Sequence, residues 1–417
     1  DHRDLHSFPT RRSSDLPLGN TVDELWQNLL NGVSGAADIT HFDTSNYKTK
    51  FACEVKNFDP LKYFDRKEVR KVDPFAQYAM AASEEAILDA KIDSTLDHDR
   101  IGVIMATGIG GFTSFLQEAI EFGKGGGIPR FNPFFIPKII GDIAAGHISI
   151  KYGFRGPNFA TTSACASAGH AIIDAFHYIQ LGKANIILAG GSEAGINPAG
   201  IGGFNAMHAI STRNDDPKSA SRPFDKDRDG FVLGEGGGVV ILEELEHARM
   251  RGAKIYAEVV GIGSTADANH ITSPHPEGLG AKLAMQYALE DAGLAPETVD
   301  HINTHGTSTP VGDIAEPKAI VSLFGDHAYK INLNSTKSMH GHLLGAAAAV
   351  ELIATTFAVK YDIVPPTINH FTDDPEIDNR LNFTFHKPVK RTVNVALSNS
   401  FGFGGHNTCI AVKKYIE

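Results

Sequence analysis

Three side chains in this sequence have the chemistry and the placement of an acyl-transfer site: Cys165, His305 and His342. Each follows a short apolar segment with the pattern of a strand, at the point where that segment ends. Because ligands bind at the carboxyl ends of strands in α/β sheets, we expect the three side chains to lie close together. A thiol beside two imidazoles fits a cysteine hydrolase, and it also fits an acyl carrier in carbon–carbon bond formation, which needs N–H donors for the developing oxyanion.

Cys165 lies in a run of small residues, 161–170, between a predicted strand (157–160) and a predicted helix that ends near Leu181. The unpaired N–H groups at a helix N-terminus favour negative charge, so this position predicts a thiol that ionises easily. The alternative is a buried structural cysteine, which is the commoner role for a lone cysteine in an apolar setting.

Other motifs in the sequence give only weak evidence for a functional site. His340 and His342 could in principle bind a metal, but the HExxH pattern and a third ligand cluster are absent from the sequence, and we predict no metal site. Residues 190–194 nearly match the GxSxG nucleophile elbow, with Ala194 where the last glycine belongs, so Ser192 is a weak candidate nucleophile in a predicted tight turn. Nothing matches GxxxxGK[ST], which leaves nucleotide binding unsupported.

The composition sets outer limits on function. A chain of 417 residues exceeds the size of one growing hydrophobic core, so two halves are expected. The net charge of −11 argues against nucleic-acid binding. Three widely spaced cysteines indicate neither a disulfide framework nor a zinc site, and they fit a reducing compartment. The sequence has no run of eighteen apolar residues, so we predict no membrane span.

The elements that position these residues alternate between strands and helices, which predicts an α/β fold with largely parallel sheets. A strand, a reactive residue and a small-residue helix occur in the same order twice, over 159–181 and over 333–360. This repetition suggests an internal duplication, with one half over 17–252 and the other over 253–417.

The first sixteen residues differ from the rest of the chain. They have no apolar run and no periodicity, and they lack the hydrophobic middle of a signal peptide. A capping box at 21–24 begins the next helix, and a strand ought to precede it. We therefore expect residues 1–16 to be a non-native leader without that strand, which would leave neighbouring backbone groups unpaired and the chain poorly stable.

Four motifs, carried by residues 164–168, 303–310, 335–342 and 399–405, resemble those of the β-ketoacyl-[acyl-carrier-protein] synthases, and within that family the elongating enzymes of bacterial fatty-acid synthesis. The likeness runs in order from Pro17 to the C-terminus. It implies a thiolase-like fold, with two similar halves stacked in five α-β-α-β-α layers, usually as a homodimer. It also implies a decarboxylative Claisen condensation without a resident cofactor, on substrates carried by the phosphopantetheine of acyl carrier protein.

The resemblance assigns roles residue by residue. Cys165 would be the nucleophile, His305 and His342 would assist decarboxylation and stabilise the enolate, and Lys337, paired with Glu316, would support His342. The backbone N–H groups of Cys165 and Phe403 would form the oxyanion hole, and Phe403 would gate the acyl pocket. The remaining substrate-binding residues would be Ile109 and Phe204 along the acyl chain, and Thr272, Thr307 and Thr309 along the pantetheine. The basic stretch Arg66, Lys67, Arg70 and Lys71 would dock the acidic carrier protein; otherwise it is a solvated helix face.

Two residues depart from the family pattern: His340 and His406 stand where threonine is usual, and we expect them to alter the polarity of the pocket or its pH profile. The second histidine argues against the initiating synthases of the family, which have a Cys-His-Asn site. A non-catalytic chain-length partner and a ketosynthase of a polyketide or aryl-polyene pathway are the alternatives. The expected setting is the cytoplasm, with neither a nucleic acid nor a membrane as partner.

Overall fold

The computed structural model describes residues 7–416, with side chains described for residues 16–416, so the first six residues of the expected leader lie outside it. Within this part of the chain ten strands form one continuous sheet that divides into two sets of five. The N-terminal set comprises β1 (Ser7–Asp15), β4 (Ile101–Ala106), β5 (Asn158–Thr161), β6 (Ile186–Glu193) and β7 (Gly236–Glu244). The C-terminal set comprises β8 (Glu258–Ala266), β9 (His301–Asn303), β10 (Asn332–Asn334), β13 (Val395–Gly402) and β14 (His406–Lys413).

The two sets have the same topology. Their orders are β5-β4-β6-β7-β1 and β10-β9-β13-β14-β8, which place corresponding strands at corresponding positions. The directions also agree, since the pairs β4–β5, β4–β6, β9–β10 and β9–β13 are parallel and the other pairs within each set are antiparallel. The sheets are therefore mixed, where the sequence predicted largely parallel ones. The repeated order supports an internal duplication, and the boundary that we propose at 252/253 falls between α9 (Leu245–Met250) and β8.

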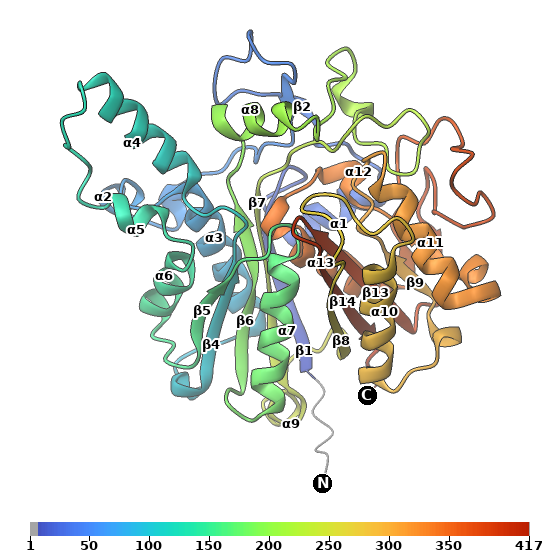
Figure 1. Cartoon of the computed structure of the whole chain (residues 1–417). Helices are drawn as coiled ribbons and strands as arrows, with labels where there is room; N and C mark the ends of the chain where they lie inside the picture. The colour runs from blue at the N-terminus through green and yellow to red at the C-terminus, as the bar shows by residue number, and fades with distance from the viewer. Residues whose placement is uncertain (1–6, 417) are drawn as a thin grey trace.

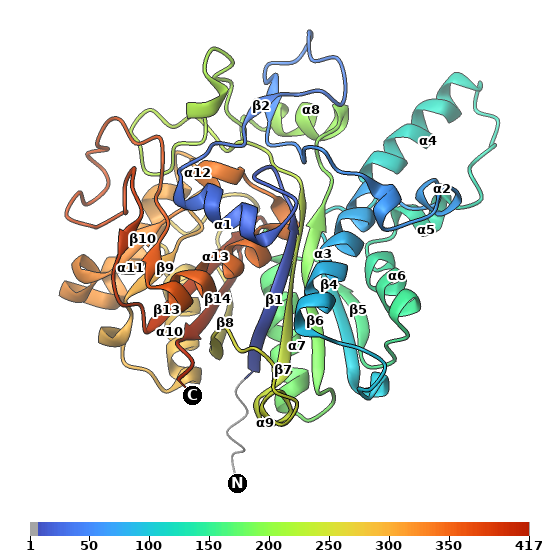
Figure 2. The same cartoon turned by 180° about the vertical axis from the view of Figure 1, so that it is seen from behind.

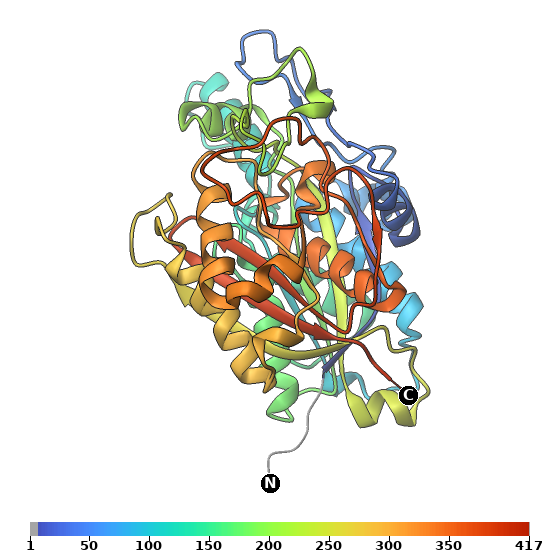
Figure 3. The same cartoon turned by 90° about the vertical axis from the view of Figure 1, so that its right-hand side faces the viewer.

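Helices separate and cover the two strand sets (Figure 1). Two central helices, α7 (Ser167–Gln180) and α13 (Ala347–Tyr361), pack on each other and contact strands of both sets. On the outer faces, α3 (Pro74–Ala90) and α6 (Ile143–Tyr152) cover the N-terminal strands and α10 (Leu279–Ala292) covers the C-terminal ones, with α11 (Gly312–Phe324) beside it. The layers follow the order α-β-α-β-α across Figure 1, and Figure 3 looks onto the outer helices of the C-terminal half, which lie in front of the red strands.

The apolar composition of α13 follows from its central place. The stretch Leu344–Tyr361 is long and apolar enough to span a membrane by composition, but 89% of it is buried inside the protein. Because both strand sets and α7 surround this helix, it needs apolar side chains on every side. It is a core helix of the middle layer.

The N-terminal strand is a point where the sequence prediction was wrong. The backbone of Ser7–Asp15 forms β1, paired antiparallel with β7 from Ser7↔Glu244 to Asp15↔Gly237, with an irregularity between Thr10 and Ser13. Figure 2 shows β1 between the two halves of the sheet. The N–H and C=O groups of β7 require a partner whatever side chains that partner carries, so pairing can form without an apolar pattern. Low stability of this region stays a prediction.

The remaining elements lie around the edges and above the sheets. The helices are α1 (Val22–Leu30), α2 (Arg66–Val69), α4 (Phe112–Lys124), α5 (Phe135–Ile139), α8 (Pro198–Ala206) and α12 (Lys337–His340), and the short strand pairs are β2 (Ala37–Asp38) with β3 (Phe51–Ala52) and β11 (Ile363–Val364) with β12 (Val389–Lys390). Residues 112–140, here the α4–α5 arm, project from the side of the molecule next to α2 (Figure 1).

Candidate active site

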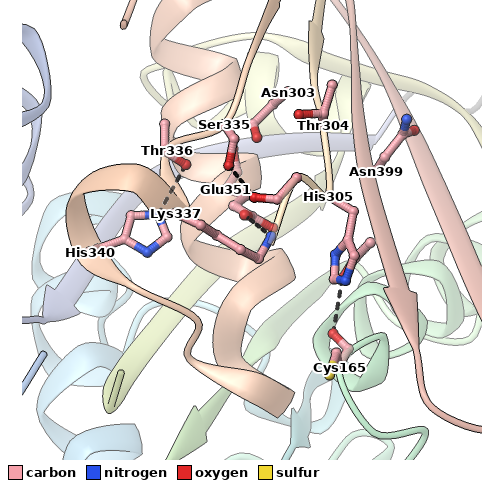
Figure 4. Close-up of polar contacts among 12 residues, drawn as sticks. Cys165, Asn303, Thr304, His305, Ser335, Thr336, Lys337, His340, Glu351 and Asn399 are labelled. Carbon is pink, nitrogen blue, oxygen red and sulfur yellow. Dashed lines mark hydrogen bonds and ion pairs between the residues drawn. The ribbon is translucent and has the colours of Figure 1, made fainter. Parts of the chain in front are cut away.

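Cys165, His305 and His342 line one cavity of about 460 Å³. Cys165 lies between β5 and α7, His305 follows β9, and His342 follows α12. The rings of His305 and His342 are nearly perpendicular with centroids 5.5 Å apart. Figure 4 shows His305 directed at Cys165. The structure thus brings together the three side chains that the sequence predicted to meet, one from the N-terminal half and two from the C-terminal half.

The turn that carries Cys165 is tied tightly by its own small polar residues. The Ser167 hydroxyl accepts a hydrogen bond from the Ser163 N–H at 2.8 Å and donates to the Ala164 carbonyl at 2.6 Å. Ala164 adopts a left-handed backbone with φ of +51°, which a small side chain tolerates better than a large one. Ser400, on β13, donates to the Cys165 carbonyl at 2.9 Å and so fixes the turn to the other half of the molecule.

The thiol of Cys165 does not ionise easily in this structure, contrary to the prediction from its helix. Burial raises its pKa to about 12, although the Lys337 cation and hydrogen bonds from the N–H groups of Phe403 and Cys165 act in the opposite direction. Cys165 comes two residues before the first residue of α7, and its exposed fraction is only 8%. Desolvation of a thiolate therefore outweighs the favourable helix end. The two N–H groups on the sulfur are those that the sequence analysis names as the oxyanion hole.

Both histidines of the cavity are neutral. Burial lowers the pKa of His305 and of His342 well below the ordinary value, and the positive charge of Lys337 lowers both further. In each ring the Nδ1 atom has no hydrogen-bond partner among the described residues. A neutral imidazole carries one N–H donor and one acceptor nitrogen, so each ring can donate to a developing oxyanion or accept a proton.

Lys337 pairs with Glu351 of α13, and its predicted pairing with Glu316 was wrong. Glu316 instead accepts the backbone N–H groups of His305 at 2.9 Å and Gly306 at 3.0 Å, and an amide hydrogen of Asn399 at 3.0 Å. These three donors already satisfy Glu316, which leaves Glu351 as the carboxylate that contacts the cation. Burial raises the pKa of Glu351 to about 7, with Lys337 opposing the rise.

The six residues predicted to bind substrate all line the same cavity; they are Ile109, Phe204, Thr272, Thr307, Thr309 and Phe403. The hydroxyls of Thr307 and Thr309 lie 3.0 Å apart, and Phe403 is followed by two glycines with positive φ, Gly404 at +89° and Gly405 at +78°. Hydroxyls on one wall and aromatic rings on another suit a ligand with an amide-containing arm and an apolar tail.

His340 and His406 do not line the cavity. His340 is buried and hydrogen-bonds the Thr336 hydroxyl at 3.0 Å and the Gly341 carbonyl at 2.8 Å, and Figure 4 shows it pointing away from Cys165. His406 is exposed, with its ring 6.4 Å from that of His170. Neither side chain therefore changes the polarity of the cavity lining, which was one of the two expected effects. An effect of His340 on the pH profile stays a prediction, because its charge lowers the pKa of His342.

Comparison with known proteins decides the family. Models of the β-ketoacyl synthase N-terminal and C-terminal domains match residues 13–248 and 256–371. The chain belongs to the β-ketoacyl synthase family. It is 50% identical to the 3-oxoacyl-[acyl-carrier-protein] synthase 2 of a Synechocystis species, over 96% of this chain and 95% of that protein. The proteins of the same name from Staphylococcus aureus strain COL and Coxiella burnetii are 47% and 45% identical, each over 96% of both chains.

Solved structures agree with the thiolase-like fold. A β-ketoacyl synthase from Burkholderia phymatum matches with a TM-score of 0.92 and 32% identity, over 99% of this chain and 100% of that one. A complex of a type II polyketide synthase acyl-carrier protein with its ketosynthase, bound to a hexaketide, also matches with a TM-score of 0.92 at 33% identity, over 99% of this chain and 100% of that one.

Sequence reasoning missed Arg228, a buried residue that holds the segment carrying Thr307 and Thr309 on the cavity wall. Its guanidinium donates to the carbonyls of Thr309 at 3.0 Å and Pro310 at 2.7 Å and pairs with Asp374 at 2.6 Å. The only signal was an arginine within a charged, glycine-containing stretch, 222–230, whose burial no local pattern indicates.

Two other predictions concern residues outside the cavity. Ser192, the weak candidate nucleophile, is fully buried within strand β6 and is not in a turn, which excludes a serine elbow there. Of the basic stretch, Arg66, Lys67 and Arg70 are exposed on and beside α2, whereas Lys71 pairs with Glu68 at 2.6 Å.

Proposed function

We propose that this protein is an elongating β-ketoacyl-[acyl-carrier-protein] synthase of fatty-acid biosynthesis. The observation that carries the proposal is a cysteine with two N–H donors on its sulfur, facing two neutral imidazoles in one cavity. Identity of 45–50% to proteins named 3-oxoacyl-[acyl-carrier-protein] synthase 2 supports this over a polyketide ketosynthase, because the ketosynthase of the hexaketide complex is 33% identical. A non-catalytic chain-length partner would lack the nucleophile, and Cys165 is present.

In the first half-reaction Cys165 takes the acyl group from acyl carrier protein. The sulfur–carbon bond to Cys165 forms, the bond to the pantetheine sulfur breaks, and the proton of the Cys165 thiol ends on the departing pantetheine thiol. The N–H groups of Cys165 and Phe403 donate to the oxyanion of the tetrahedral intermediate. Because a thiol with a pKa near 12 is a poor nucleophile, its proton must leave as the sulfur attacks, and a neutral imidazole of the same cavity, His305 or His342, can accept it.

In the second half-reaction malonyl-carrier protein loses CO2 and the resulting enolate attacks the acyl group on Cys165. The enolate oxygen accepts hydrogen bonds from the N–H groups of His305 and His342, which are neutral because the site is buried and close to Lys337. A carbon–carbon bond forms, the bond to the Cys165 sulfur breaks, and the cysteine regains one proton from water. Glu316 holds the backbone of the His305 turn during both steps.

The direct test is to incubate the protein with hexanoyl-acyl carrier protein and to locate the added mass by peptide mapping. We expect the hexanoyl group on Cys165, with no label in a Cys165→Ala variant. Added malonyl-carrier protein should then release CO2 and clear the label from the wild-type protein. Absence of label would favour the non-catalytic partner, and label on Ser192 would favour a hydrolase; either result would contradict the proposal.

We propose that acyl carrier protein docks on Arg66, Lys67, Arg70 and Lys71, because three of these four cations are exposed on one short helix and its end. Opposite charges across an interface accelerate encounter and fix register. Reversing two charges, Arg66→Glu with Arg70→Glu, should raise KM for acyl-carrier protein while leaving acylation by a small acyl-pantetheine thioester unchanged. Lys183→Glu, at an exposed position after α7, is the matched control.

We also propose a homodimer that buries the α4–α5 arm. The arm exposes apolar side chains, among them Phe115, Ile128, Phe131 and Ile136 at 50%, 53%, 43% and 58% exposure, and β5 is an edge strand of the same half. A patch of this kind on a protein marks an interaction surface. Sedimentation should give twice the 44.8 kDa chain mass, and Phe131→Asp with Ile136→Asp should give the monomer.

The three free cysteines support a cytoplasmic location.

A further inference from the structure

A buried carboxylate that plays no part in the chemistry above lies behind the cavity wall. Glu193 is the last residue of β6, it is 1% exposed, and it does not line the cavity. The structure records no ion pair to it among the described residues. A charge buried without a cation needs several hydrogen bonds to compensate for lost hydration.

Glu193 receives four such hydrogen bonds, and they come from two separate turns. From the first turn, its Oε1 accepts the Thr107 hydroxyl at 3.0 Å and the Ile109 N–H at 3.2 Å, and its Oε2 accepts the Gly108 N–H at 2.7 Å. From the second turn, Oε2 also accepts the Gly345 N–H at 3.0 Å. One carboxylate therefore joins the turn at 107–109 to the turn at 344–345.

Both turns form cavity wall. Ile109 and Gly108 from the first and Leu344 from the second all line the space in front of Cys165. The turns meet through glycines: a Cβ on Gly345 would lie 2.1 Å from the Gly108 nitrogen, and a Cβ on Gly108 would lie 2.7 Å from Glu193 Oε2. The two turns thus approach closely at their glycines, and the Glu193 carboxylate is hydrogen-bonded to both of them.

We infer that Glu193 is a positioning residue that holds the Ile109 turn against the Leu344 turn and thereby sets which acyl lengths the cavity accepts. The inference rests on the proposed function, since it assumes that Cys165 carries acyl groups. Glu193 acts through the two turns and does not touch the substrate. In the sequence this residue lies in the stretch 190–194, which nearly matches a nucleophile elbow. The candidate there was Ser192, whereas the role inferred here belongs to its neighbour Glu193.

The test replaces the acceptor without changing its shape. In Glu193→Gln the amide NH2 faces N–H donors, so up to two of the four hydrogen bonds are lost and the turns can separate. Ser192→Ala is the matched control: it alters the neighbouring residue of the same strand, whose hydroxyl has no hydrogen-bond partner among the described residues. The measured quantity is the ratio of kcat/KM for acylation of Cys165 by dodecanoyl- and hexanoyl-carrier protein.

We expect Glu193→Gln to change this ratio by about tenfold, the effect of losing one hydrogen bond to a charged group, while Ser192→Ala keeps the wild-type ratio. A residue that only stabilised the fold would lower both rates together. A ratio within threefold of wild type would overturn the inference, and a larger change supports it.

A second variant covers the case in which Glu193→Gln does not fold. Thr107→Val removes one donor to Glu193 and the acceptor of the Gly110 N–H, which lies 3.0 Å from the hydroxyl, and leaves the carboxylate in place. The ratio should move beyond the same threefold limit, and a ratio inside it counts against the inference. If the wild-type protein takes up neither acyl group, the proposed function has failed instead, so the two failures are distinct.

Discussion

The pH dependence of Cys165 alkylation tests the physical core of the proposed site. With a pKa of about 12, the thiolate fraction at pH 7 is about 10⁻⁵, since each unit between pH and pKa is a factor of ten. Because iodoacetamide reacts with the thiolate, its rate on Cys165 should rise about tenfold per pH unit through pH 10 without a plateau. A thiol governed by its helix end would instead reach a plateau near neutral pH.

Lys337 provides the second perturbation. Its positive charge is the largest influence that lowers the Cys165 pKa, so removing it should raise that pKa further. We expect Lys337→Met to slow alkylation at every pH, by a factor of about ten for each pKa unit gained. Lys337→Met with Glu351→Leu is the matched control, because it removes the cation together with the carboxylate that pairs with it.

The assay quenches the reaction at timed intervals and quantifies the alkylated peptides. Cys53 and Cys409 are internal references, because both are buried free thiols that do not line the cavity. A plateau in the Cys165 rate below pH 8 would refute the argument that burial outweighs the helix end, and so would a Lys337→Met rate equal to wild type.

Three further predictions follow from burial and close contact. Lys337→Met leaves Glu351 without its cation and should lower the free energy of unfolding in urea by about 3–5 kcal/mol, most of which the double variant with Glu351→Leu recovers; equal losses in both variants would be inconsistent with a buried ion pair. Burial raises the pKa of Cys53 from 9.0 to about 12, so the stability that its thiol contributes is complete below pH 9 and is lost as pH rises from 9 to 12. The decrease in the urea midpoint between pH 8 and pH 11 should therefore be smaller for Cys53→Ala than for wild type, and an equal decrease would reject the shift. A Cβ on Gly402 would lie 2.7 Å from the Ser163 carbonyl oxygen and 3.0 Å from the Cys165 nitrogen, so Gly402→Ala should slow acylation by about 10²-fold, whereas Gly203→Ala, with open space around it, should not.

The order of elements and the meeting of the reactive side chains could be predicted from sequence because both depend on local pattern. Strand ends, glycine turns and small-residue helices are read directly from residues 157–181 and 331–360. Each strand end offers its reactive residue locally, and Cys165 after β5 and His305 after β9 then meet because the two strand sets pack on the same central helices, α7 and α13.

The failures share a different cause, which is that they depend on what surrounds a residue in three dimensions. The partner of Lys337 is decided by whether Glu316 has already been satisfied by backbone N–H groups, and no spacing in the sequence reports that. The Cys165 pKa depends on desolvation by residues from both halves. β1 forms because β7 needs a partner, a demand that its own side chains do not signal.

The shared strand order has a consequence for how such a protein can arise and be taken apart. Each half by itself would leave one flank of its central helix bare, so the fragments 7–252 and 253–416 should recombine when produced as separate polypeptides. A gene that doubled could then let its copies diverge, one keeping the sulfur and the other the nitrogen bases. The catalyst would be a fused ancestral pair in which neither member retained a complete set of reactive groups.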